Sequence, residues 1–218
     1  ALGTVPIEED GSANFLAPAG RVLYFQLLDA EYNELQRMRS VIQLQPGERR
    51  GCIGCHEDRH SSPPAEVGLA LLQPPRSLQP PPWGPEAFDY QKVVQPVLDA
   101  HCVKCHDGTE ASRPDLRGSL DVARVPVSYR TLIKGGWVHY FDFTYGMRHF
   151  KAEPLSFGSL RSRLWAVLAG KQHEDVSLDE AGMRAIKAWI DLNCPLWPDY
   201  IYRPDRPGPD AVEISAAR

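Results

Sequence analysis

Two copies of one short pattern, Cys-x-x-Cys-His, constrain this chain of 218 residues more than any other feature. The copies are Cys52-Ile53-Gly54-Cys55-His56 and Cys102-Val103-Lys104-Cys105-His106. Two cysteines at this spacing followed directly by histidine are the attachment signature of c-type haem. In such sites the adjacent imidazole lies under the ring and ligates the iron. The sequence therefore predicts two covalently bound haem c groups, one at each copy.

Zinc and disulfides are the alternatives for two pairs of cysteines. Residues 56–101, which number 46, separate the pairs, whereas roughly 15–20 residues separate the pairs of a zinc ribbon. A disulfide framework is open to a protein outside the cytosol. Neither alternative explains why histidine follows both pairs. A thioredoxin-like motif is expected once, within a βαβ pattern that this sequence lacks. Haem attachment is thus the favoured interpretation.

Charge and hydropathy limit the partners. Lys and Arg total 24 against 28 Asp and Glu, a net charge of −4, and no basic stripe favours nucleic acid. No apolar run is long enough to span a membrane. Because c-type haem is joined outside the cytoplasm in bacteria, we expect a periplasmic or otherwise exported protein. The chain opens at Ala1 without Met, and residues 2–7 have the composition of a strand entered midway. This favours a piece of a longer protein.

We predict an α+β fold in three parts. Residues 1–50 are expected to be β-rich and similar to a small β-sandwich, with strands over 22–28 and 41–44 and a turn over 29–34. Residues 51–85 are expected to hold the first haem and a proline-rich linker. Of the 20 prolines, 8 fall between Pro63 and Pro85, which excludes a regular helix or a central strand there.

Residues 86–218 are expected to form a mostly helical haem domain with a C-terminal tail. Apolar spacing predicts a helix over 90–100 that leads into Cys102 and another from Ser159 to Gly170. A capping box, Ser177-Leu178-Asp179-Glu180, predicts the start of a final helix that Pro195 ends. The order of these elements resembles a class I cytochrome c domain. In both, a helix and the haem motif come first, followed by a variable middle, a loop and a last helix.

The loop before the final helix supplies the second iron ligand in such domains. Met183 lies inside the predicted helix, whereas His173 lies in the loop, so we expect His106 and His173 to be the two ligands of the second haem. His101 is expected to interact with the end of the preceding helix. His139, Met147 and His149 remain alternatives for the far side of the first iron.

The ligands of the first iron are left open between two histidines. His60 follows His56 by four residues, so a short helical turn would put both side chains on one face. Either side chain is a candidate iron ligand. The fifth cysteine, Cys194, follows the final helix and is expected to be a buried, inert thiol.

Six short segments in combination are similar to one known family. They are residues 3–6, 10–13, 45–49, 94–99, 173–178 and 189–192. They resemble the C-terminal half of hydrazine synthase alpha subunits and of their synthase-like relatives, over most of residues 3–200. The resemblance implies a propeller domain upstream and a periplasm-like location.

The resemblance also implies roles for the two haems. In that family the first haem is catalytic, a tyrosine four residues after the motif histidine ligates its iron, and the motif histidine helps to hold a zinc ion. The matching residue here is His60, which favours His60 as an iron ligand and weakens the case for the synthase chemistry. The second haem relays electrons between two histidine ligands, which matches His106 and His173.

Two classes of function remain. The first is electron transfer by a dihaem cytochrome to or from a redox partner protein or an upstream domain. The second is a haem enzyme, synthase-like or peroxidase-like, in which the first haem acts on a small nitrogen or oxygen species and the second is its electron relay. No set of residues suggests another catalytic centre, so no catalytic residue is assigned.

Overall fold

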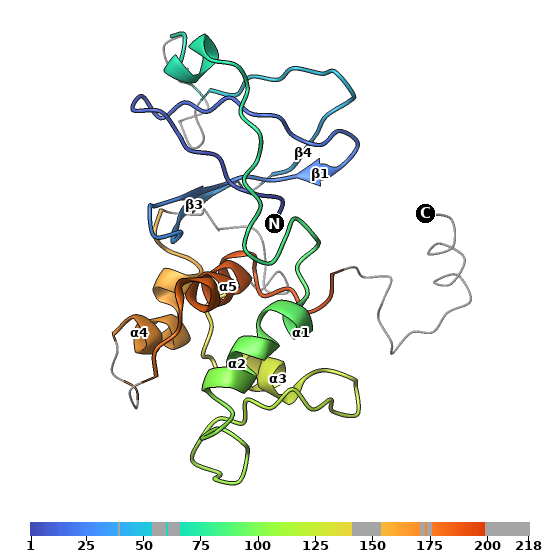
Figure 1. Cartoon of the computed structure of the whole chain (residues 1–218), viewed down its shortest axis with the longest axis vertical. Helices are drawn as coiled ribbons and strands as arrows, with labels where there is room; N and C mark the ends of the chain where they lie inside the picture. Colours follow the sequence, from blue (N-terminus) through green and yellow to red (C-terminus); the bar gives the residue numbers. More distant parts are fainter. Residues whose placement is uncertain are drawn as a thin grey trace, which may run out of the picture. The chain divides into compact units, whose positions relative to one another are not determined.

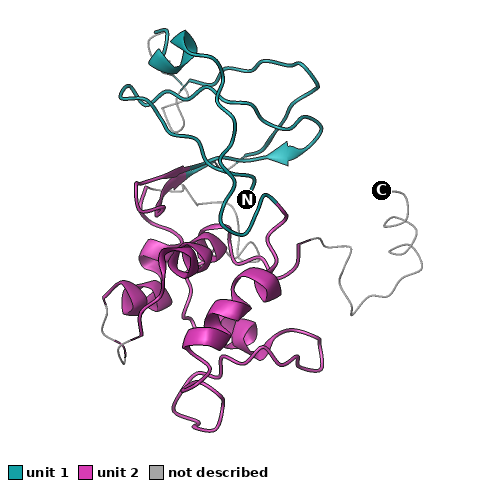
Figure 2. Cartoon of the chain, in the orientation of Figure 1, with its two compact units in different colours: residues 1–26, 37–85 teal, residues 27–36, 86–218 magenta. Residues whose placement is uncertain are grey.

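The structure is a computed structural model that describes residues 1–38, 40–53, 60, 66–140, 154–170, 173 and 176–198. Short strands come first in the chain and helices follow, so the predicted α+β composition is confirmed (Figure 1). The chain divides into two compact units (Figure 2). Unit 1 comprises Ala1–Gln26 and Arg37–Pro85, and unit 2 comprises Leu27–Gln36 and Glu86–Arg218.

Unit 1 is built from short paired segments. Strand β1 (Val22–Leu23) pairs antiparallel with β4 (Ile42–Gln43). Further along, the backbones of Thr4 and Gln79 exchange two hydrogen bonds of 2.9 Å each, and a second bridge joins Phe15 to Arg76. The N-terminal segment and the proline-rich stretch therefore run side by side within this unit. Ahead of these bridges the stretch also forms a 3₁₀ helix, η1 (Leu69–Leu72).

The β-sandwich expected for residues 1–50 is not seen among the described residues. The two sheets have two strands each, β1 with β4 and β2 (Gln26–Leu28) with β3 (Glu34–Arg37). The strand expected over 22–28 is divided into β1 and β2, and the expected turn ends early because Glu34 already belongs to β3. Leu23 and Ala70 are the buried hydrophobic residues described in unit 1. So little buried apolar surface cannot hold two sheets face to face.

Unit 2 contains five α-helices among its described residues. They are α1 (Tyr90–Val93), α2 (Gln95–His101), α3 (Val127–Lys134), α4 (Arg163–Ala169) and α5 (Glu180–Asp191). The single helix expected over 90–100 is divided at Val94. Pro96 lies at the start of α2, where its missing N–H costs least, and this explains the division. Sequence spacing did not predict α3.

The core of unit 2 is an aromatic cluster between α1, α3 and α5. The rings of Tyr90 and Trp189 are 5.0 Å apart, and the ring of Tyr129 lies 5.2 Å from Tyr90 and 5.9 Å from Trp189. Around them, Leu98 and Ile186 are each only 1% exposed. The apolar spacing of the first and last predicted helices is thereby confirmed, since both bury the expected face.

The final helix begins two residues later than its sequence pattern predicts. Asp179, not Ser177, is its N-cap, and the Asp179 carboxylate accepts a hydrogen bond of 2.7 Å from the N–H of Gly182. Asp and Ser are about equally good caps, so the choice between them depends on the tertiary position of the turn. Met183 lies inside α5, as predicted.

A buried carboxylate fixes the segment that precedes α4. Asp191 is 2% exposed and accepts hydrogen bonds from the backbone N–H of Ser159 (2.6 Å) and from its hydroxyl (2.9 Å). Ser159 opens the 3₁₀ helix η2 (Ser159–Arg161), which leads into α4. Gly170 ends α4, as predicted.

The β2–β3 hairpin contributes Leu27–Gln36 to unit 2. The Nζ of Lys187 on α5 donates a hydrogen bond to the carbonyl of Glu31 in the hairpin turn. The guanidinium of Arg184 lies 3.6 Å from the ring centroid of Tyr32. One helix thus holds the turn by two cationic side chains, although the sequence pattern placed this hairpin with the N-terminal region.

Candidate functional site

The second Cys-x-x-Cys-His motif follows α2 without a break. The N–H of Cys102 donates to the carbonyl of Leu98 (2.8 Å), and the N–H of His106 donates to the carbonyl of Cys102 (3.0 Å). These turns wind the motif into a compact loop at the end of the helix. The thiols of Cys102 and Cys105 are both free, and Cys105 is exposed. Burial raises the pKa of the Cys102 thiol to about 11.

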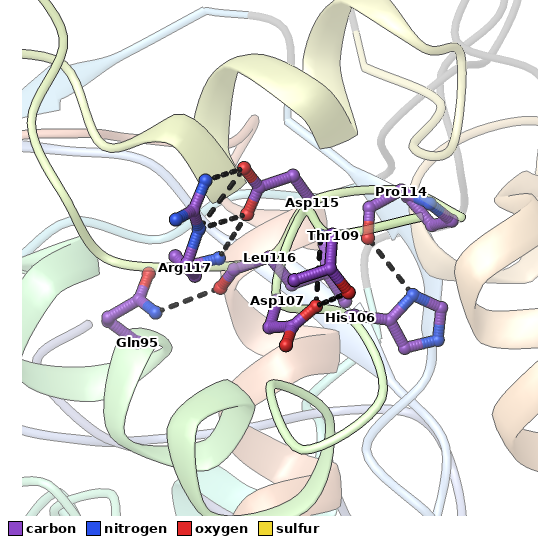
Figure 3. Close-up of polar contacts among 8 residues, drawn as sticks. All are labelled: Gln95, His106, Asp107, Thr109, Pro114, Asp115, Leu116 and Arg117. Atoms are coloured by element: carbon purple, nitrogen blue, oxygen red, sulfur yellow. Dashed lines mark hydrogen bonds and ion pairs between the residues drawn. The ribbon is translucent and has the colours of Figure 1, made fainter. Parts of the chain in front are cut away.

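The ring of His106 is oriented by a backbone carbonyl. Its Nδ1 lies 3.0 Å from the oxygen of Pro114, as Figure 3 shows. A carbonyl oxygen only accepts hydrogen bonds, so Nδ1 is the donor, and in the neutral ring the lone pair is then on Nε2. This is the arrangement in which a metal-ligating histidine is usually held. Nothing in the sequence identified Pro114, because the contact is made by the backbone.

His173 faces His106 across a short gap. The Nε2 atoms of the two rings are 3.4 Å apart, and the ring planes are inclined by 34°. His173 lies between α4 and α5, and both rings are half-buried. The structure thus brings together the two histidines that the sequence pairs as ligands of one iron.

Charged side chains line the loop that carries His106. Asp107 accepts hydrogen bonds from the N–H of Thr109 (3.0 Å) and from its hydroxyl (2.6 Å), and these bonds lower the pKa of Asp107. Arg117 donates to Asp115 at 2.6 Å and lowers the pKa of that carboxyl group (Figure 3). Gly108 has a φ of 77°, and a Cβ there would lie 2.5 Å from an Asp115 oxygen. The loop therefore requires glycine at this position.

The first motif is described only in part. Cys52 is exposed and its thiol is free. Cys55 and His56 lie outside the described residues, and His60 is an exposed residue in a turn. The choice between His56 and His60 as a ligand of the first iron therefore stays open.

The other candidate ligands are placed as follows. His101 is the last residue of α2 and is exposed. His139 is exposed, its backbone N–H donates to the hydroxyl of Ser162 (2.8 Å), and its ring lies 5.7 Å from Phe157. Met147 and His149 lie outside the described residues. Cys194 is 3% exposed and follows α5, which confirms the predicted burial of its thiol.

Two features are absent from the described part of the chain. No group of three or more His, Cys, Asp or Glu side chains there is arranged to hold a metal ion. No helix among the same residues is long and apolar enough to cross a membrane.

Fold and site define an α+β chain with a facing histidine pair beside a Cys-x-x-Cys-His loop. Residues 1–57 match the family model of the hydrazine synthase alpha subunit middle domain. The match includes the whole first motif and ends at residue 57, so the similarity to that domain is confined to residues 1–57. No curated protein and no solved structure matches the chain.

Proposed function

We propose that this chain is a dihaem c-type cytochrome module that transfers electrons. The observation that carries the proposal is the facing pair of Nε2 atoms, 3.4 Å apart, beside two free thiols at the haem-attachment spacing. Cys102 and Cys105 would hold the macrocycle, and His106 and His173 would ligate its iron. Bound in this way, haem iron supplies reversible one-electron transfer.

The residues of the site fit such a group. A transition metal lies about 2 Å from an imidazole nitrogen, so two such ligands on opposite sides are about 4 Å apart. The observed separation of 3.4 Å is shorter by about 0.6 Å, which a small outward shift of one ring supplies. With Nδ1 donating its hydrogen bond to the Pro114 carbonyl, the neutral His106 ring has its lone pair on Nε2, as a ligand requires.

The chain's own residues set the electron affinity of the site. The Pro114 carbonyl increases the electron donation of the His106 ring, and a second imidazole in place of a thioether favours ferric iron. Both effects favour a low reduction potential. A redox partner protein or an upstream domain would exchange electrons with this site, in a periplasmic or otherwise exported location.

We extend the proposal to a second haem at the first motif. Cys52 and Cys55 are the attachment pair there, with His56 or His60 as the iron ligand. One observation favours an enzyme at this position: the match to the hydrazine synthase alpha subunit middle domain spans the first motif. In that alternative the first haem acts on a small nitrogen or oxygen species and the second haem relays its electrons.

The experiment is to produce the chain in a host that attaches c-type haem and to measure its intact mass and pyridine haemochrome spectrum. We expect the mass of two haems. Replacing both Cys102 and Cys105 with Ala should remove one haem, and replacing Cys52 and Cys55 should remove the other. Cys194→Ala is the control and should retain both. A parent protein without covalent haem refutes the proposal.

Carbon monoxide then separates the two candidate functions. A relay with two strong ligands on each iron leaves the reduced spectrum unchanged when carbon monoxide is added. An enzyme needs an open or weakly held position on the first iron, so a shift confined to the haem of Cys52 and Cys55 favours the synthase-like alternative.

A further inference from the structure

A buried chain of hydrogen bonds connects three helices to the loop of His106. The Tyr90 hydroxyl donates to the Ser128 hydroxyl (2.9 Å), which donates to Oε1 of Gln95 (2.5 Å). Nε2 of Gln95 donates to the carbonyl of Leu116 (3.1 Å) and to Asp99 (2.8 Å). Tyr90 and Ser128 are fully buried and Gln95 is 6% exposed.

The direction of every bond in this chain is fixed. The Leu116 carbonyl only accepts, so Nε2 of Gln95 faces it and Oε1 faces Ser128. Burial raises the pKa of Tyr90, so its hydroxyl stays protonated and is able to donate. The Ser128 hydroxyl accepts that bond and directs its own proton to Gln95. The Gln95 amide is therefore held with its oxygen towards Ser128 and its nitrogen towards Leu116. A buried polar chain that is satisfied in this way specifies one arrangement of the helices around it.

Leu116 connects the Gln95 side chain to the backbone of His106. The N–H of Leu116 donates to the carbonyl of His106 (2.9 Å), and the carbonyl of Leu116 accepts from Gln95 (Figure 3). Both polar groups of this residue are thus held. Two residues earlier, the Pro114 carbonyl accepts from Nδ1 of His106. The position of this carbonyl depends on the segment that Gln95 fixes.

The backbone near Gln95 is shaped to admit its side chain. A Cβ at Gly118 would lie 2.9 Å from both Cγ and Cδ of Gln95, so the loop passes directly against the amide. The N–H of Ser128 donates to the carbonyl of Arg117 (3.0 Å) and holds the same segment from the side of α3.

We propose that Gln95 is a positioning residue for His106. By holding the Leu116 carbonyl it keeps the Pro114 carbonyl against Nδ1, and it thereby sets the orientation and the electron donation of the His106 ring towards a bound haem. This inference rests on the proposed function of the His106–His173 pair. It assigns Gln95 no contact with the haem.

The test compares Gln95→Met with the parent dihaem protein. Methionine has about the length of glutamine but donates no hydrogen bond. Loss of an outer-shell partner typically changes metal affinity by about 10-fold to 100-fold. If ferric iron loses tenfold more affinity than ferrous iron, the reduction potential rises by about 59 mV. We expect a rise of this order for the haem of Cys102 and Cys105, with no change at the other haem.

Two further readouts report the His106 ring itself. Paramagnetic resonance of the oxidised protein should show altered g values, because these depend on how the two imidazole planes are oriented. Proton NMR should show faster exchange of the Nδ1 proton of His106. A variant that only lowers stability can speed proton exchange through unfolding, but it leaves the g values unchanged.

Two other variants keep the proposal testable should Gln95→Met fail to fold. Gly118→Ala removes no polar group, but its added Cβ displaces the Gln95 amide. It should therefore change the reduction potential of the same haem in the same direction. Ser159→Ala is the matched control, because it removes a different buried hydrogen bond in unit 2 and should leave the potential unchanged.

The outcomes separate the two proposals. A parent protein without haem at Cys102 and Cys105, or without two histidine ligands there, refutes the proposed function. A parent with both ligands whose potential, g values and Nδ1 exchange are unchanged in Gln95→Met and in Gly118→Ala refutes the role of Gln95 alone. Equal shifts in Ser159→Ala also refute it, because the effect would then be general destabilisation.

Discussion

Nε2 of His173 lies 3.4 Å from Nε2 of His106, although 67 positions separate the two residues in the chain. One residue belongs to the loop after α2 and the other lies between α4 and α5. A pair so distant in sequence is brought together by the whole helical unit. The short distance between the two rings therefore depends on the packing of the helical unit as well as on the two histidines themselves.

If the proposed haem at Cys102 and Cys105 is present, replacing His173 with Met should retain it and raise its reduction potential. The thioether favours ferrous iron, and covalent links to Cys102 and Cys105 would not depend on His173. Redox titration followed by optical spectroscopy measures the change. His101→Gln, at an exposed position on the end of α2, is the control and should have no effect. An unchanged potential and spectrum in the His173 variant would show that another residue is the ligand.

Two alanine variants test the iron ligand of the haem proposed at Cys52 and Cys55. If His60 ligates its iron, His60→Ala should alter the spectrum of the haem at Cys52 and Cys55 and leave the other haem unchanged. If His60 does not ligate the iron, His60→Ala should leave the spectrum unchanged. His56→Ala should then alter the spectrum of that haem instead. If neither variant changes the spectrum, the ligand of the first iron would be His139, Met147 or His149.

Ser159→Ala should lower the free energy of unfolding by about 1–3 kcal/mol. The substitution removes the hydroxyl that donates to the buried Asp191 carboxylate, and an unpaired buried acceptor costs roughly this amount. Urea unfolding followed by circular dichroism measures the loss. Ser119→Ala, at an exposed serine, should stay within about 0.5 kcal/mol of the parent. A similar effect of both substitutions would contradict the role assigned to Asp191.

Arg117→Gln should raise the pKa of Asp115 towards its ordinary value of 3.8, because the guanidinium is the largest cause of the lowered pKa. A carboxyl group whose pKa is lower in the folded state stabilises the fold above its ordinary pKa. That contribution is lost as the pH falls through the folded-state value. The variant should therefore have a lower free energy of unfolding than the parent near neutral pH. In acid the two free energies should converge. NMR titration of the Asp115 carboxyl group and unfolding as a function of pH measure both effects.

The helices were largely predictable because their signals are local. The apolar spacing of α5 and the stop at Gly170 both depend on residues within a few positions of one another. The same reasoning joined α1 and α2 into one helix, because apolar spacing continues through Pro96. It did not detect α3, whose β-branched residues Val127, Thr131 and Ile133 have weak helix propensity.

The sequence singled out the side chains of the candidate site, but it did not reveal the groups that orient them. Cys102, Cys105 and His106 are identified by adjacency, and His173 by its place before the last helix. Gln95 and the Pro114 carbonyl have no such mark, since their roles arise from backbone groups that tertiary packing brings near. The hairpin over 27–36 shows the same limit: its strands are local, but its attachment to α5 depends on residues far along the chain.

The hydrogen bond between Lys187 and the Glu31 carbonyl spans 156 positions, which has a consequence during protein synthesis. A ribosome adds about 5–20 residues per second, so roughly 8–30 s pass between the synthesis of the hairpin turn and that of its partner on α5. During that interval the hairpin turn has been synthesised, but the helix that donates to its Glu31 carbonyl has not. Until α5 has been made, the hairpin of unit 2 lacks the cationic side chains that hold its turn. Slow elongation over residues 32–187 is therefore expected to expose the hairpin to proteolysis and to premature association with other nascent chains.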